Sequence, residues 1–234
     1  KDTKSNSVLW IGNGLNLTFK GDSWEEIIKN ICHKTKNASI CPENIYPLPY
    51  NLQIVVASED CVEAEMNKLA ETMRDSEISD DMCTFIRENL LTIPIDNIIT
   101  TNYTYELEKT INPSYSTHFS NRARKKVIDG NERQNQFMIY RYNEVGDKKI
   151  WHIHGEACTP STVIMGQYYY GKLVFTIQEY LSHRMGVLKH CYKNNIDIKN
   201  PSYIDLFLTK DVYVMGFGMD FSEIDFWWLA CCKK

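Results

Sequence analysis

The sequence predicts an α/β fold: a Rossmann-like, doubly wound and mostly parallel sheet with a helical or loop insertion. Short runs of apolar and β-branched residues recur along the chain, which is typical of buried strands. Segments with apolar residues at helical spacing separate these runs, and this alternation is typical of a doubly wound sheet. Ligands bind such sheets at the carboxyl ends of the strands, so the residues that follow each strand are the candidates for a site.

Five segments are expected to form the strands. They are Ser7–Ile11, Ile95–Thr101, Phe137–Tyr142, Lys149–His154 and Asp211–Met215. The third and fourth are expected to be joined through Gly146-Asp147, since glycine allows a tight turn there.

Helices are expected between the strands, where polar N-cap residues precede apolar residues at helical spacing. The expected helices begin at Asp22 or Ser23, run from Val62 to Met73, follow Ser79, span Tyr105–Ile111, run from a Thr176/Glu179 capping box to about Tyr192, and follow Ser222. The segment 35–50, with three prolines, is expected to be a loop, and residues 112–136 an irregular insertion.

Composition places the chain among ordinary globular domains and excludes several classes. The 234 residues, 43% of them hydrophobic, are enough for one large domain, which we expect to span residues 1–234. The net charge of −4 provides no basic field for nucleic acid. No window approaches the roughly 18 apolar residues of a membrane span. None of the eight cysteines forms a C-x-x-C pair, so we expect free thiols, a reducing cytoplasm and no metal site.

A glycine-rich loop follows the first expected strand. It reads Gly12-Asn13-Gly14-Leu15-Asn16, and exposed backbone amides in such a loop can bind a pyrophosphate. Leu17 stands where a third glycine of the dinucleotide-binding pattern would be. The loop by itself therefore fits a plain tight turn as well as a nucleotide site.

Two polar residues follow the second and fourth expected strands. Asn102, between Thr101 and Tyr103, carries a donor and an acceptor on a short side chain. His154 precedes Gly155, where the chain can turn, and its position suits a general base. The alternatives are an asparagine that closes a strand and a hydrogen-bonded core histidine. His152 is interpreted as structural.

A second glycine loop follows the last expected strand. It reads Gly216-Phe217-Gly218-Met219-Asp220, with Asp225 on the helix that follows. Asp220 or Asp225 could accept a hydrogen bond from a ribose or an adenine amine. Either carboxylate could instead stabilise the N-terminus of the helix.

Taken in order, these segments resemble the SIR2 family, and in particular its SIR2-like branch in bacterial antiphage defence. The resemblance rests on the two glycine loops, on Trp24 in Ser-Trp-Glu-Glu, and on Thr101-Asn102-Tyr103. It rests further on His152-Ile153-His154-Gly155, which is similar to the His-Gly motif of the catalytic histidine, and on Met165–Tyr169. A related abortive-infection family also carries a Gly-Asn-Gly loop, an Asn-Tyr and a His-Gly.

The resemblance implies a fold that binds NAD and an enzyme that cleaves its nicotinamide–ribose bond to give nicotinamide and ADP-ribose, or cyclic ADP-ribose. It implies Asn102 and His154 as catalytic residues. The residues implied for binding NAD are Gly12, Asn13, Gly14, Leu15, Asn16, Thr101, Tyr103, Gly216, Phe217, Gly218, Asp220 and Asp225. The alternatives are a sensor that binds NAD or an ADP-ribose derivative without turnover and an NAD-dependent protein deacylase.

Two departures from the family pattern bear on these alternatives. The paired cysteines of the deacylase zinc ribbon are missing, which disfavours deacylation. Thr104 stands where many relatives carry an aspartate, so no role is assigned to it. Defence enzymes of this kind are usually restrained until they are triggered, so we expect a C-terminal regulatory domain or partner protein. A homo-oligomer is a further expectation, for which the sequence contains no direct signal.

Overall fold

A five-stranded sheet lies at the centre of the protein. The computed structural model describes residues 6–19, 21, 23–34, 42–58, 62–74, 78–115 and 139–233. The sheet has the order β3-β4-β2-β1-β5, with β1 (Ser7–Ile11), β2 (Asn97–Thr100), β3 (Asn143–Val145), β4 (Lys148–His152) and β5 (Asp211–Met215). Four strands are parallel, and only β3 pairs in the antiparallel sense. The predicted Rossmann-like α/β fold is confirmed.

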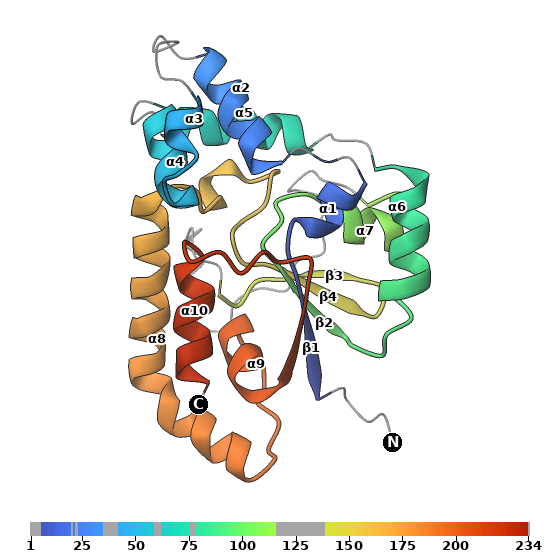
Figure 1. Ribbon diagram of the computed structural model, residues 1–234. Helices are drawn as coiled ribbons and strands as arrows, with labels where there is room; N and C mark the ends of the chain where they lie inside the picture. Colours follow the sequence, from blue (N-terminus) through green and yellow to red (C-terminus); the bar gives the residue numbers. More distant parts are fainter. Residues whose placement is uncertain are drawn as a thin grey trace.

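Helices cover both faces of this sheet (Figure 1). One face carries α8 (Gln167–Lys193), α9 (Tyr203–Thr209) and α10 (Ile224–Cys232). The other carries α1 (Gly14–Thr18), α6 (Asp80–Phe85), its π-helical continuation (Ile86–Leu90) and α7 (Glu106–Ile111). Beyond the carboxyl ends of the strands lie α2 (Trp24–Lys34), α3 (Pro42–Ile45), α4 (Tyr50–Ala57) and α5 (Val62–Arg74), at the top of Figure 1.

The central strands are buried on both faces, because successive side chains of a strand point in opposite directions. Trp10, Ile99 and Trp151 pack against the helices α8, α9 and α10. Leu9 and Ile98 pack on the opposite side, with residues of α6 and α7. A third apolar cluster joins α2, α4 and α5 to Val163 and Met165. Within the described residues, no helix combines the length and the apolar character that a membrane span requires.

Two predicted helix starts are confirmed by their caps. Ser23 Oγ accepts the backbone N–H of Glu26 at 3.2 Å, and the Glu26 carboxylate accepts the backbone N–H of Ser23 at 2.7 Å. This reciprocal pair is a capping box. Ser79 Oγ accepts the backbone N–H of Met82 at the start of α6.

The strand predicted at Phe137–Tyr142 is wrong. The strand of the hairpin is Asn143–Val145, immediately before Gly146, and Val145 pairs with Lys148 across the turn. A tight turn pairs the residues that flank it directly, so the strand has to begin after Tyr142. Phe137 and Met138 lie outside the described residues, as do residues 116–136 of the predicted insertion.

The helix predicted to start at Thr176 begins instead at Gln167. Thr176 lies within α8, where its hydroxyl donates to the carbonyl of Lys172 at 2.9 Å, the usual bond of a threonine inside a helix. Burial of Leu173 and Ile177 on the same helix face outweighs the local capping pattern. The predicted loop 35–50 contains the short helix α3, and α10 begins at Ile224, slightly after Ser222.

A buried carboxylate, Asp205 of α9, ties α9 to α8. It accepts hydrogen bonds from Tyr180 Oη at 2.7 Å and from Arg184 Nε and Nη2 at 3.2 and 3.0 Å. It also accepts the backbone N–H of Ser202 at 3.1 Å, completing a capping box. These bonds compensate the cost of removing the charge from water.

We predict that Asp205→Ala lowers the free energy of unfolding by about 3 to 5 kcal/mol, because it leaves buried donors without an acceptor. Urea denaturation measures the change. The matched control is Asp197→Ala, which removes an ion pair with Lys210 from a side chain that is 58% exposed and should cost less than about 1 kcal/mol. Equal effects of the two substitutions would contradict the account of this contact.

Candidate functional site

A cavity of about 820 Å³ lies where the parallel strands end, a size common among small-molecule sites. Its wall combines residues that follow β1, β2, β4 and β5 with residues of α2, α4 and α6. The carboxyl ends of parallel strands meet at one edge of the sheet. Segments far apart in the sequence therefore contribute to one site.

The two glycine loops contact each other directly. The backbone N–H of Gly14 donates to the carbonyl of Gly216 at 2.7 Å, and that of Gly12 donates to the carbonyl of Met215 at 3.0 Å. A Cβ on Gly12 would lie 2.7 Å from the Gly216 carbonyl oxygen. Glycine is therefore needed at position 12 for the contact between the loops.

The loop after β4 places His154 in the cavity wall. β4 ends at His152, and Gly155 then adopts a φ of +94°, with the Thr162 carbonyl oxygen 2.1 Å from where a Cβ would be. Only glycine fits this turn. The backbone N–H of Ile164 donates to the carbonyl of His154 at 2.7 Å, which holds the turn in place.

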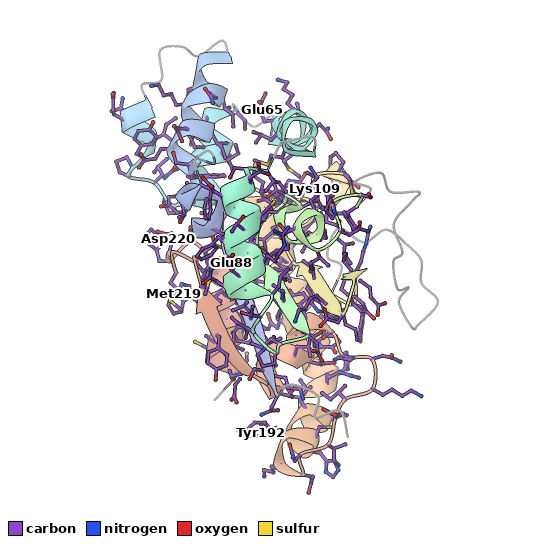
Figure 2. The ribbon with its side chains drawn as sticks, turned by 90° about the vertical axis from the view of Figure 1, so that its right-hand side faces the viewer. Glu65, Glu88, Lys109, Tyr192, Met219 and Asp220 are labelled. Carbon is purple, nitrogen blue, oxygen red and sulfur yellow. The ribbon has the colours of Figure 1, made fainter. Side chains whose placement is uncertain are left out.

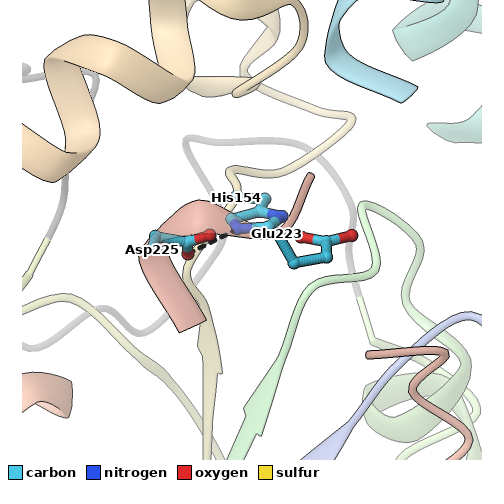
Figure 3. A group of neighbouring side chains, drawn as sticks. All are labelled: His154, Glu223 and Asp225. Atoms are coloured by element: carbon cyan, nitrogen blue, oxygen red, sulfur yellow. Dashed lines mark hydrogen bonds and ion pairs between the residues drawn. The ribbon is translucent and has the colours of Figure 1, made fainter. Parts of the chain in front are cut away.

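Three ionisable side chains lie close together, those of His154, Glu223 and Asp225 (Figure 3). His154 Nε2 lies 2.9 Å from Oδ2 of the buried Asp225. Because a carboxylate only accepts hydrogen bonds, Nε2 carries the ring proton and Nδ1 keeps its lone pair. Tyr170 Oη is 3.5 Å from Nδ1 and donates to Glu223 at 3.3 Å. The ring is thus oriented from one side and has a basic nitrogen on the other.

The pKa values of two groups are shifted by this arrangement. Burial by itself lowers the pKa of His154, but the charge and hydrogen bond of Asp225, with the charge of Glu223, outweigh it and raise that pKa above 6.5. Burial raises the pKa of Glu223 from 4.5 to about 7, although the charge of His154 opposes the shift. Glu223 can therefore exchange protons near neutral pH, and the raised pKa makes His154 a stronger base than a free imidazole.

Among the described residues, His154, Glu223 and Asp225 form the one group whose side-chain types and spacing could hold a metal ion. Ligand atoms of His154, Glu223 and Asp225 all lie within 4.8 Å of one another. The 2.9 Å contact between His154 and Asp225 is an ordinary hydrogen bond. We therefore interpret the group as an acid–base network, and the absence of a metal stays a prediction.

Asn102 also lines the cavity, just after β2, the strand that pairs with β4. Its backbone N–H donates to Thr100 Oγ1 at 3.1 Å, and its side-chain Nδ2 donates to Glu106 Oε1 at 2.6 Å. Nδ2 also lies 3.4 Å from the carbonyl oxygen of Gly12. The side chain is thus held by α7 on one side and by the first glycine loop on the other.

His152 lies beneath the cavity, in a buried polar network. Nδ1 contacts the Asn102 carbonyl oxygen and Nε2 contacts Glu108 Oε1, both at 2.7 Å. Asn143 donates to Glu108 and to Glu156. Burial lowers the pKa of His152, but Glu108, Glu156 and the Asn102 carbonyl together raise it to about 9. His152 is therefore protonated at neutral pH and donates from both nitrogens, which fits the predicted structural role.

A model of the family described as "SIR2-like domain" matches residues 96–230. The match spans more than half of the 234 residues, from the start of β2 to near the end of α10. The chain belongs to the SIR2-like domain family. A comparison with curated proteins found no match. SIR2-like domains use NAD as a substrate, so the family indicates chemistry that involves NAD.

Most of the residues predicted for a SIR2-like site are brought together. Those that line the cavity are Asn13, Gly14, Asn16, Thr101, Asn102, Tyr103, His154, Gly216, Phe217, Gly218 and Asp220. Gly12 lies at the contact between the loops, Leu15 is buried in the apolar core, and Asp225 lies behind His154. These three therefore support the site without forming its wall.

Asp220 lines the cavity and also forms hydrogen bonds within its own loop. Its Oδ1 accepts the backbone N–H and the hydroxyl of Ser222, at 2.8 and 2.6 Å. Figure 2 shows Asp220 beside Met219 on the loop that follows β5, at the outer edge of the molecule. One carboxylate oxygen of Asp220 is therefore used to shape the turn that leads into α10.

Several polar residues of the wall were not predicted as site residues, among them Thr104, Glu106, Tyr170 and Glu223. Thr104 Oγ1 accepts from Asn16 Nδ2 at 3.3 Å. Glu106 follows Asn102 by four residues, but residues 101–105 are not helical, so helical spacing does not account for their contact. No pattern in the sequence indicates that Tyr170 and Glu223 approach His154.

We predict that the free energy of unfolding falls as the pH rises through the folded pKa of His152. Because that pKa is raised from 6.5 to about 9, the stabilisation is complete below 6.5 and is lost above about 9, a change of about 3 kcal/mol. Urea denaturation across this range should show that the difference in the free energy of unfolding between wild type and His152→Gln becomes smaller at high pH. A difference that does not change with pH would argue against the His152–Glu108 ion pair. So would the same pH dependence in the exposed control, His183→Gln.

Proposed function

We propose that this SIR2-like domain is an NAD⁺ glycohydrolase, which cleaves the bond between nicotinamide and ribose and releases ADP-ribose. The observation that carries the proposal is the pair formed by His154 and Asp225 beside a cavity that Asn102 also lines. This arrangement supplies a polarised base and a polar contact in one space. Cyclic ADP-ribose is the product if the adenine, in place of water, attacks the ribose.

The leaving group determines what the protein has to supply. Nicotinamide departs with the electron pair of the C–N bond, which neutralises the positive charge of its ring, so no proton has to be donated to it. Positive charge develops on the ribose as the bond breaks. The carboxylate form of Glu223, in the cavity wall, stabilises this charge.

Water then completes the reaction. Its oxygen forms a bond to the ribose carbon, and Nδ1 of His154 accepts a proton from it. The Asp225 carboxylate keeps the proton of the ring on Nε2 and stabilises the imidazolium that forms. Asn102 holds a ribose hydroxyl or the attacking water, and the loop at Asn13 and Gly14, which lines the cavity, faces the pyrophosphate. NAD⁺ and water thus give nicotinamide, ADP-ribose and a proton.

We predict that the protein converts NAD⁺ to nicotinamide and ADP-ribose without an acyl peptide. Asn102→Ala and His154→Ala should each lower kcat about 10²- to 10⁴-fold, the contribution of one oriented group. Chromatography of the products measures turnover, and circular dichroism checks folding. The matched controls are the exposed side chains of His183 and Asn67, whose alanine variants should keep wild-type turnover.

Two outcomes would overturn the assignment. If turnover required an acyl peptide, the protein would be a deacylase. If NAD⁺ bound saturably without any product, the protein would be a sensor.

We predict that kcat/KM falls as the pH drops through the pKa of His154, because only the neutral ring can accept a proton. Asp225→Asn removes the charge that raises this pKa above 6.5, so the acidic limb should move to lower pH while kcat falls. The pH dependence of kcat/KM for wild type, Asp225→Asn and the exposed control Asp81→Asn measures the shift. An acidic limb that stays in place in Asp225→Asn would show that another group titrates.

Because the sequence resembles antiphage defence proteins, we also propose a biological role for the activity. Depletion of NAD in an infected bacterium is the role that we propose for the activity. A C-terminal regulatory domain or partner protein and a homo-oligomeric state stay predictions, as does a cytoplasmic location. Expression of the active protein and of His154→Ala in bacteria challenged with phage tests the role, because only the active protein should lower cellular NAD and phage yield.

A further inference from the structure

The contact between Asn102 and Glu106 is unusual for a site wall, because both side chains are almost fully buried. They are 5% and 2% exposed, and Asn102 Nδ2 lies 2.6 Å from Glu106 Oε1. Glu106 is in the first turn of α7, four residues after Asn102, and both residues line the cavity. The pair therefore belongs to the site and not to the protein surface.

This contact sets the orientation of the Asn102 amide. A carboxylate accepts hydrogen bonds but cannot donate them, so it selects the orientation that directs the NH₂ group toward Glu106. The second contact of Nδ2 is again an acceptor, the carbonyl oxygen of Gly12 at 3.4 Å. Both neighbours of the NH₂ group are acceptors, and the amide oxygen has to point elsewhere.

The remaining oxygens of the pair have no partner. Asn102 Oδ1 and Glu106 Oε2 are both buried, and neither has a hydrogen-bond partner among the residues that the structure describes. Unsatisfied buried acceptors lower the stability of a fold. Glu106 forms no ion pair with any described cation, so charge pairing with the protein does not explain its burial.

We propose that Glu106 is a positioning residue that fixes Asn102 as a hydrogen-bond acceptor for a hydroxyl group of the reaction, on the ribose or on the attacking water. The inference rests on the proposed cleavage of NAD⁺. It adds that Asn102 accepts, and does not donate, the hydrogen bond to this hydroxyl. The hydroxyl donates to Oδ1, which supplies the partner that the amide oxygen lacks.

The role of Glu106 depends on its being an acceptor only. In Glu106→Gln the new side chain can donate as well as accept, so the Asn102 amide is free to turn and present its NH₂ group to the substrate. Asn102→Asp places two carboxylates in direct contact, and like charges at this distance cannot both stay ionised. In the double variant, the amide introduced at position 106 donates to the carboxylate introduced at position 102. The hydrogen bond is thereby restored in the reverse direction, and the second oxygen at position 102 is again an acceptor.

The experiment compares kcat and KM for NAD⁺ among wild type, Glu106→Gln, Asn102→Asp and the double variant. Glu106→Gln should lower kcat about 10²-fold, as expected for a misplaced contact, with KM nearly unchanged and the same melting temperature. The double variant should be at least about tenfold more active than Asn102→Asp, because the two sites are coupled. Glu88→Gln, an exposed glutamate on the π-helical turn, is the control and should match wild type.

A spectroscopic readout tests the hydrogen bond without turnover. The side-chain amide protons of Asn102, assigned by their loss in Asn102→Asp, should move upfield in Glu106→Gln, because the bond to a charged acceptor is replaced by a weaker one. Glu88→Gln should leave these resonances in place.

The outcomes separate this inference from the proposed function. An active wild type with a Glu106→Gln variant of equal kcat, or with unchanged Asn102 amide protons, would overturn the role of Glu106 alone. A double variant no more active than Asn102→Asp would do the same. A wild type without turnover would overturn the proposed function and this role with it.

Discussion

Parallel pairing of β4, β2, β1 and β5 is the constraint on which the site depends, because it brings the carboxyl ends of four strands to one edge. The pairing is fixed residue by residue, with Ile11 opposite both Thr100 and Met215, and Thr100 opposite His152. The residues that follow these strands must then be neighbours. The cavity forms there because the two glycine loops touch and the turn at Gly155 directs His154 toward them.

The chemistry of the site depends on pairs of polar side chains that are hydrogen-bonded to each other. Asp225 orients His154 from α10, and Glu106 orients Asn102 from α7. Beneath them, the charged pair of His152 and Glu108 holds the backbone carbonyl of Asn102. Each of the two side chains that we propose as catalytic is thus supported by a carboxylate on a helix that packs against the sheet. Such support reduces the reorganisation that a reacting group needs.

The sequence predicted four of the five strands and the residues that follow them, because these depend on local signals. An apolar run followed by glycine, as at Ile11-Gly12, specifies both a buried strand and the turn after it. It did not predict the start of α8, because packing of Leu173 outweighs the capping pattern at Thr176. The roles of Tyr170 and Glu223 depend on contacts between distant segments, for which one sequence contains no signal. Similarly, the sequence contains no signal for the hydrogen bond between Asp225 and His154, and binding of NAD by Asp225 stays a prediction.

The central claim is that NAD⁺ binds across the two glycine loops with its scissile bond between Asn102 and His154. The most direct measurement is a crystal structure of the His154→Ala variant with NAD⁺ bound. The account predicts the pyrophosphate against the backbone of Asn13 and Gly14, and the nicotinamide-bearing ribose within hydrogen-bond distance of Asn102 Oδ1. NAD⁺ bound outside this cavity, or bound in it with the nicotinamide end away from Asn102 and position 154, would contradict it.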